Sequence, residues 1–413
     1  MRWTLSMLLL CGSSLAGAFD SPSYQDFEQP PHSYWQRTLN DPFTRLKADL
    51  DSGIISLDRT SERAFLVSLL KALDIPSSSQ MLVFSTTSLQ LRLIRTHNPR
   101  ALFFNEDVYL GFVPNGQIEI VSLDPEVGGI FYLMDIPRED RPLRIERSAR
   151  CMNCHAAAET SYLPGLTIKS SVPGPNGGTV ASFRQERVGH AVPFEERFGG
   201  WYVTGRHAIP NHWGNLSGRL FEGELTKIPL DPGSQFRVEK YPHPSSDILP
   251  QLIHEHQAGF VNRVLEASYR TRTALHISEG KLSAGQMSEL DEQSNLLTRY
   301  LLFADEAKLP GPVEGDESFR EDFLKTRRIA SNGLSLKDFD LQTRLFKHRC
   351  SYMIYSRVFN GLPAEMKQRV YRRLGEALNT ANPEPEYAWL PAAEKNAIRA
   401  ILKETLSDLP AGW

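Results

Sequence analysis

The sequence lacks the features that mark several large classes of protein. Its 413 residues contain only 4 cysteines, too few for a disulfide-rich scaffold, and its 46 Lys and Arg nearly balance its 49 Asp and Glu. A formal net charge of −3 provides no basic surface for nucleic acid or for an anionic membrane, so we expect no nucleic-acid partner. A hydrophobic content of 41% excludes a wholly disordered chain.

Long hydrophobic runs are also missing. No stretch approaches the roughly 20 apolar residues of a membrane-spanning helix, so we expect a chain that does not span a membrane. At the N-terminus, Arg2 precedes the apolar run Leu8–Leu10, and small residues lead to Ala16-Gly17-Ala18. This pattern is typical of an export signal. It predicts a signal peptide over residues 1–18, cleavage after Ala18 and a periplasmic location, whereas lipid attachment at Cys11 is a minor alternative.

What the sequence does contain is one compact chemical motif. Residues 151–155 read Cys-Met-Asn-Cys-His, the spacing at which two cysteines form thioethers to one haem and the following histidine ligates the iron. A redox dithiol would follow a buried strand, but residues 144–150 are mostly polar. A zinc site would need two further ligands, and no second C-x-x-C is present. We therefore predict one covalent haem c, attached to Cys151 and Cys154 with His155 as proximal ligand, and a buried thiol at Cys350.

The occupant of the second axial position of the iron separates electron transfer from small-molecule chemistry. His207 and His212 lie in the segment 199–215, whose glycines and aromatic residues are typical of a loop over a flat group, although either could be an ordinary surface histidine. His256 falls on the apolar stripe of a predicted helix over 248–269, where most histidines are core residues. We predict a histidine ligand, His212 or His207 ahead of His256. Candidate partners for the haem propionates are the arginines after the motif, Arg184, Arg197, Arg206 and Arg219.

The apolar pattern predicts an α+β fold, with a small antiparallel sheet ahead of a haem-binding loop region and a mainly helical C-terminal half. The predicted divisions are the signal peptide 1–18, N-terminal helices and sheet 19–136, the haem c-binding region 137–246 and a helical region 247–413. Within them, strands are expected at 81–85, 101–104, 107–113, 118–122 and 129–134, and helices at 287–304, 319–330, 336–356, 363–378 and 392–406.

The chain resembles a group of exported bacterial proteins described as cytochrome c domain-containing proteins. The resemblance spans most of the chain after residue 18 and rests on CMNCH, on residues 79–88 (SQMLVFSTTS), on 99–111, on 193–215 with GGWYVTGRH, on His256-Gln257 and on 336–356. Members often carry Met where Trp213 stands here, which disfavours a methionine ligand from that loop. The resemblance implies covalent haem and export, and it implies no particular reaction.

Three functions are consistent with these features. The first is a periplasmic monohaem c-type cytochrome that passes electrons to a periplasmic or membrane redox partner. The second is a haem-dependent peroxidase or oxidase with an open distal site, favoured by Trp201, Tyr202 and Trp213 near the candidate histidines. The third is a haem-based redox or gas sensor module. The state of the second axial position would distinguish the first from the second.

Overall fold

The predicted sheet is the centre of the N-terminal half. The computed structural model describes residues 25–137, 143–175, 177–182 and 188–413, so the predicted signal peptide lies outside the described residues. Seven antiparallel strands have the order β6-β5-β4-β3-β2-β1-β9. Their bounds are β1 Met81–Val83, β2 Arg100–Phe104, β3 Val108–Phe112, β4 Gln117–Asp124, β5 Gly128–Asp135, β6 Ile145–Arg147 and β9 Trp201–Tyr202. The five strands predicted before the motif are confirmed.

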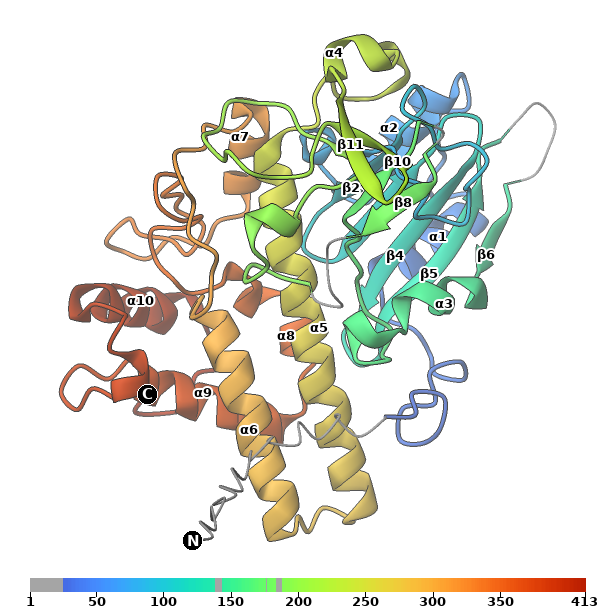
Figure 1. Ribbon diagram of the computed structural model, residues 1–413. Helices are drawn as coiled ribbons and strands as arrows, with labels where there is room; N and C mark the ends of the chain where they lie inside the picture. Colours follow the sequence, from blue (N-terminus) through green and yellow to red (C-terminus); the bar gives the residue numbers. More distant parts are fainter. Residues whose placement is uncertain (1–24, 138–142, 176, 183–187) are drawn as a thin grey trace, which may run out of the picture.

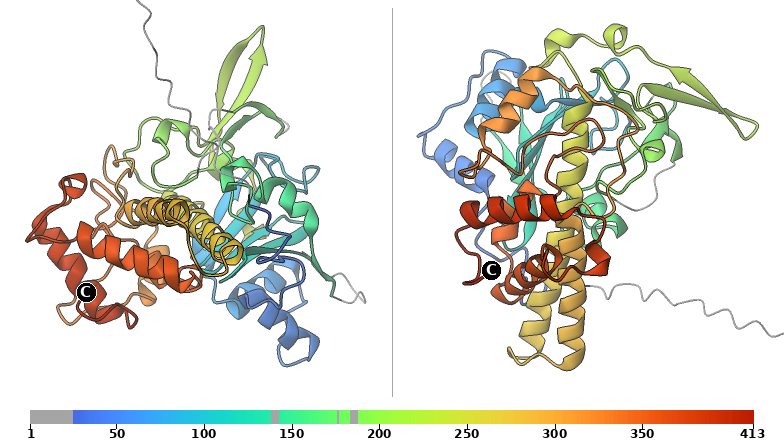
Figure 2. Two further views of the ribbon diagram at one scale, coloured as in Figure 1. Left: turned by 90° about the horizontal axis from the view of Figure 1, so that it is seen from below. Right: turned by 90° about the vertical axis from the view of Figure 1, so that its left-hand side faces the viewer.

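Two strands of this sheet, β6 and β9, were not predicted. β6 is a short, charged edge strand, and β9 contains only two residues and joins β1 from a segment that follows the motif. Two separate hairpins complete the β structure: β7 Ser171–Pro173 with β8 Thr179–Ser182, and β10 Leu216–Phe221 with β11 Glu224–Pro229. The β10–β11 hairpin projects from the body of the molecule (Figure 2).

The two faces of the sheet differ in burial. On β4, Ile118 and Ile120 are fully buried on one face, which α1 (Pro42–Asp51) and α2 (Glu62–Ala72) cover from behind in Figure 1. The intervening residues of β4, Glu119 and Val121, point to the opposite face and are only partly buried, and β2 has the same alternation. A half-buried face that includes apolar side chains is a surface on which a further group can pack.

The C-terminal half is mainly helical, as predicted. Its helices are α5 Ile248–Ile277, α6 Ala284–Leu301, α7 Glu317–Lys325, α8 Arg357–Asn360, α9 Ala364–Ala377 and α10 Ala392–Thr405, preceded by the short α3 Met152–His155 and α4 Pro232–Gln235. Single 3-10 turns occur at Ser77–Ser79, Ala149–Cys151, Ala158–Thr160, Phe194–Glu196, Val238–Lys240, Tyr352–Tyr355 and Pro385–Tyr387. The 30-residue α5 begins at the capping side chain of Asp247 and runs between the sheet and α6 and α9 (Figure 1).

The helix predicted over 336–356 is wrong. Most of this segment is irregular, and Leu341 has a φ of 56°, in the left-handed region that a helix excludes. The side chain of Asp340 accepts backbone hydrogen bonds from Gln342 (2.9 Å) and Thr343 (2.8 Å), which favours a turn. The apolar residues that suggested a helix are nevertheless buried, because they fasten the loop to the core.

The described residues of both halves share one apolar core, whose members run from Phe27 to Leu406. The segment before α1 belongs to it: Tyr34 is fully buried and its hydroxyl donates to the carbonyl of Gly129 (2.6 Å). Within the described residues, no helix is both long enough and apolar enough to cross a membrane.

Candidate functional site around residues 151–155

The CMNCH motif forms one helical turn directly after the edge strand β6. The backbone N–H of Ser148 donates to the carbonyl of Phe131 on β5 (2.9 Å), and the 3-10 turn Ala149–Cys151 then runs into α3. Side chains three residues apart lie on the same side of a helical turn, so Cys151 and Cys154 project together. Cys154 is exposed, Cys151 is partly buried, and both are free thiols. The turn therefore presents two thiols that a single group can reach.

His155 has the orientation that a metal-ligating histidine needs. Its Nδ1 lies 3.0 Å from the carbonyl oxygen of Gly165. Because a carbonyl oxygen only accepts, Nδ1 carries the proton and the lone pair is left on Nε2. Burial lowers the pKa of His155, which keeps the imidazole neutral. The ring also packs against Phe131, with centroids 4.7 Å apart.

The register of the sheet identifies what lies beside this histidine. Phe131 on β5 is paired with Val121 on β4, and Glu119, two residues along β4, is paired with Gly111 on β3. These residues therefore share the half-buried face of the sheet, the face on which Phe131 meets His155. The face of the sheet next to the motif thus combines apolar side chains with the partly buried carboxylate of Glu119.

The donor set fits a c-type haem. Two free thiols on one turn match the two thioether attachments, and a neutral imidazole with a free Nε2 matches the proximal iron ligand. Among the described residues, no group of three or more His, Cys, Asp or Glu side chains is arranged to hold a metal ion. A haem iron takes four of its ligands from the porphyrin, so it does not require such a group.

His207 and His212 are brought together, and their rings lie 5.4 Å apart. The Nδ1 of His207 accepts the backbone N–H of Ile209 (3.3 Å), and that of His212 accepts the N–H of Gly214 (3.0 Å). In the neutral ring the proton then lies on Nε2, the reverse of His155. Burial lowers the pKa of both rings, to about 4 for His212.

His256 is fully buried on α5, and both of its ring nitrogens have protein partners. Nδ1 lies 2.8 Å from Nδ1 of His190, and Nε2 lies 2.7 Å from Oγ of Ser351. Burial lowers the pKa of His256 to about 3. His256 has the surroundings of a hydrogen-bonded core histidine, and ligation of iron through either ring nitrogen would require the hydrogen bond of that nitrogen to be replaced. The assignment of the distal ligand to His212, His207 or His256 stays a prediction.

Sequence reasoning missed His190, the partner of His256. Its ring stacks on Tyr300 with centroids 4.0 Å apart, and burial keeps its pKa well below the ordinary value. No local pattern singles it out, because the contact joins segments that are distant in the chain. Cys350 is fully buried, as predicted, and burial raises its pKa.

The arginines considered as propionate partners have other contacts. Arg197 is buried and donates to the carbonyls of Val192 (2.8 Å) and His190 (2.8 Å). Arg206 is exposed and forms an ion pair with Glu314. Arg219 is exposed on the β10–β11 hairpin, and Arg184 lies outside the described residues.

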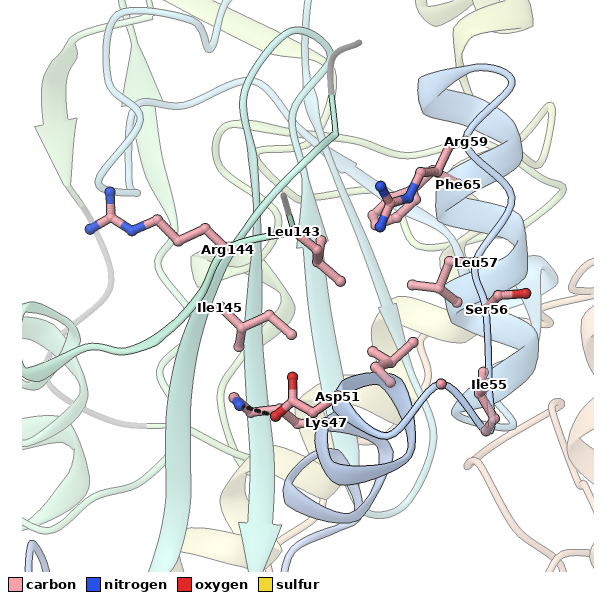
Figure 3. A pocket seen from close by; sticks show the side chains of 12 residues that line it. Lys47, Asp51, Ile55, Ser56, Leu57, Arg59, Phe65, Leu143, Arg144 and Ile145 are labelled. Atoms are coloured by element: carbon pink, nitrogen blue, oxygen red, sulfur yellow. Dashed lines mark hydrogen bonds and ion pairs between the residues drawn. The ribbon is translucent and has the colours of Figure 1, made fainter. Parts of the chain in front are cut away.

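A cavity of about 680 Å³ lies away from the motif, between α1, the segment that follows it and β6. Leu57, Leu143 and Ile145 line it, and the Lys47–Asp51 ion pair (2.5 Å) lies at its edge (Figure 3). Cys151, Cys154 and His155 are not among its lining residues.

No protein-family model, no curated protein and no solved structure matches this chain. The functional argument therefore depends on the motif and on the residues around it.

Proposed function

We propose that this protein is an exported monohaem c-type cytochrome that transfers electrons. The observation that carries the proposal is the orientation of His155, whose Nδ1 faces the Gly165 carbonyl at 3.0 Å and whose Nε2 is free, on the turn that presents both thiols. Cys151 and Cys154 would tether the haem and His155 would be the proximal iron ligand. The haem, once attached, supplies a one-electron iron couple.

The chain's own contribution is to hold the imidazole in one tautomer and one orientation. The Gly165 carbonyl fixes the proton on Nδ1 and makes the lone pair of Nε2 a better metal ligand, as is common for histidines that bind metals. Packing against Phe131 limits rotation of the ring. The hydroxyl of Thr160 donates to the His155 carbonyl (3.1 Å), which fastens the end of the turn. These contacts reduce the rearrangement that a change of iron charge would otherwise demand.

The export signal and the haem motif support each other, because c-type haem is attached outside the bacterial cytoplasm. We therefore place the mature protein in the periplasm, with a periplasmic or membrane protein as its redox partner. A histidine distal ligand would give a lower reduction potential than methionine, since thioether ligation raises it.

A second candidate is a haem-dependent peroxidase or oxidase with an open distal site. It is favoured by the engagement of His256 at both ring nitrogens and by the Nε2-protonated tautomers of His207 and His212. If His207, His212 and His256 all keep these hydrogen bonds, the second axial position of the iron is left to water or to a small substrate.

The proposal is tested by production of the full chain with a haem-maturation system. The expected result is covalent haem in the purified protein, measured by intact mass and by the spectrum of the denatured, reduced chain. The double variant Cys151→Ala/Cys154→Ala should carry no covalent haem, whereas Cys350→Ala should carry as much as the parent. Covalent haem in the double variant, or none in the parent, would contradict the proposal.

The electronic spectrum separates the two functions. A low-spin spectrum that cyanide leaves unchanged indicates a closed axial site and electron transfer. A high-spin ferric spectrum that shifts with cyanide indicates the second candidate, and turnover with peroxide should then be measurable.

A further inference from the structure

Arg100 is placed on β2, ahead of the motif in sequence but beside it in space. It lies on the half-buried face of the sheet, and its side chain crosses β3 above Gly111. A Cβ on Gly111 would lie 3.5 Å from Cδ of Arg100 and 3.3 Å from Leu102. The absence of a side chain at residue 111 therefore leaves the path along which Arg100 reaches β4.

Arg100 contacts Glu119, and both carboxylate oxygens of Glu119 accept hydrogen bonds. Nη1 of Arg100 donates to Oε2 of Glu119 (2.9 Å), and the other oxygen, Oε1, accepts from Ser88 Oγ (2.6 Å) and Gln90 Nε2 (3.1 Å). The side chains of Arg100 and Glu119 are 14% and 19% exposed. Glu119 therefore holds the guanidinium through Nη1 alone and leaves the other donors of the guanidinium available.

Those remaining donors are unused. Among the described residues, the buried Nε of Arg100 has no hydrogen-bond partner, and none accepts a hydrogen bond from its Nη2. Nε–H and Nη2–H form the side edge of the guanidinium, which binds a carboxylate through two parallel hydrogen bonds. A buried donor without a partner is unfavourable, so the position of Nε on the face of the sheet beside the motif indicates that an acceptor binds there.

The register of the sheet places the arginine beside the motif. Glu119 lies two residues along β4 from Val121, and Val121 pairs with Phe131 on β5. The ring of Phe131 packs against the ring of His155, with centroids 4.7 Å apart. Arg100, held by Glu119, therefore lies on the face of the sheet that the motif adjoins.

We propose that the Nε–Nη2 edge of Arg100, held in place by Glu119, binds a propionate carboxylate of the haem and so positions the cofactor and sets its potential. This inference rests on the proposed function, since it requires haem on Cys151 and Cys154. It replaces the arginines after the motif as the propionate partner. Arg100 is a positioning residue whose contact is with the edge of the cofactor and not with the iron.

The test compares the holoprotein with Arg100→Gln, Arg100→Lys and Glu119→Gln by redox titration over a range of pH. Arg372→Gln is the matched control, because it removes the same charge from an exposed arginine that also pairs with a carboxylate, that of Asp291. Arg100→Gln should lower the potential, since a cation near the haem disfavours the ferric state. We expect at least a tenfold change in the reduction equilibrium constant, which is about 59 mV for one electron.

The pH profile separates a propionate contact from a general charge effect. In Arg100→Gln the propionate loses its guanidinium partner and its pKa rises, so the potential should vary with pH where that of the parent is flat. Arg100→Lys should show a smaller effect, because it keeps the charge but lacks the paired donors. Glu119→Gln should shift the potential upward.

A loaded Arg100→Gln protein with the parent's potential and pH profile would overturn this inference and leave the proposed function standing. A shift without a changed pH profile would likewise overturn the propionate contact. If Arg100→Gln does not load haem, the reduction potentials and pH profiles of Arg100→Lys and Glu119→Gln test the inference instead. A parent protein without covalent haem would overturn both proposals together.

Discussion

At the scale of single residues, the hydrogen-bond partner of Nδ1 determines which ring nitrogen of a histidine has a lone pair available for a metal. The Nδ1 of His155 faces a carbonyl, whereas those of His207 and His212 accept backbone N–H groups. The sequence alone predicts His155 as a ligand, because it directly follows the C-x-x-C spacing. It cannot identify the tautomers of the other two, because these depend on hydrogen bonds formed only in the folded chain.

Replacement of His155 tests its role directly. In His155→Ala the thioethers should still form, because both cysteines remain, but the iron loses its proximal ligand. The low-spin pattern of the Soret and α bands should therefore disappear from the visible spectrum. The exposed His97 offers a control, and His97→Ala should retain the parent spectrum. An unchanged spectrum in a haem-loaded His155→Ala protein would exclude this residue as ligand.

Arg100 shows the limit of inference from proximity in sequence. Arginines after the motif were the natural candidates for the propionates, yet Arg197 caps backbone carbonyls and Arg206 faces Glu314. Arg100 precedes the motif by about fifty residues and reaches it only because β2, β3 and β4 are paired side by side. Only the register of a sheet could have revealed this proximity.

At the scale of elements, strands and helices with a clear apolar period were predictable. β2 to β5 and α5, α6, α9 and α10 all lie where the pattern placed them. The failures have physical causes. β9 is two residues long and depends on pairing with β1, and the loop 336–356 has helix-like apolar spacing but contains a side-chain-capped turn at Asp340. A tertiary contact determined the first, and a local side-chain hydrogen bond determined the second.

The N-terminal segment before α1 provides a prediction about pH. His32 is buried, its ring stacks on Tyr269 (centroids 4.1 Å apart) and its Nε2 lies 3.0 Å from Oγ1 of Thr273. Burial, then Arg272 and Arg37, lower its pKa to about 4. Because the unfolded histidine titrates near 6.5, the contribution of His32 is fully present above about pH 6.5 and is lost as the pH falls toward 4.

Hydrogen exchange should detect this loss as lower protection factors for residues 25–40 at pH 4.5 than at pH 7, after the exchange rates are corrected for the intrinsic pH dependence of amide exchange. The variant His32→Gln, which is neutral at both values, should show a smaller pH dependence for this segment. Asp26 and His276 also affect the pKa of His32, and both residues remain in the variant. The parent is therefore compared directly with His32→Gln at each pH. Equal pH dependence in parent and variant would contradict the assignment.

At the scale of the whole molecule, the predicted divisions at 136 and 246 do not separate independent cores. Apolar residues of the sheet, the motif region and the C-terminal helices belong to one cluster. Individual bonds cross the same boundaries: Tyr109 on β3 reaches Gln257 on α5 (3.0 Å), and Asn262 on α5 accepts the backbone N–H of Leu166 (2.8 Å). Such long-range contacts carry no local signal.

A pair of glycine substitutions tests the coupling of the two halves. Gly361 follows α8, and a Cβ there would overlap the carbonyl of Pro125 between β4 and β5. Gly361→Ala should therefore lower the free energy of unfolding by about 1–3 kcal/mol, as overpacking does. Gly285, in the first turn of α6, has open space around it, and Gly285→Ala should raise stability by about 0.5–1 kcal/mol.

Denaturant unfolding of the holoprotein, followed by far-UV circular dichroism, measures both changes. One cooperative transition is expected in each variant, because the halves share a core. A separate early transition in Gly361→Ala would indicate that the C-terminal helices unfold on their own.

The pairing of β1 with β9 has a consequence for the order of events during biogenesis. Leu82 pairs with Tyr202, so the entire CMNCH turn lies inside a chain loop that this pairing closes. Pairing of segments so distant in sequence is slow, because closure entropy is lost before the contacts form. The proposed export then includes an interval in which residues 151–155 have been delivered while the sheet beside them is still incomplete. Enzymes that carry out the proposed haem attachment would meet the two thiols in that interval on a flexible chain.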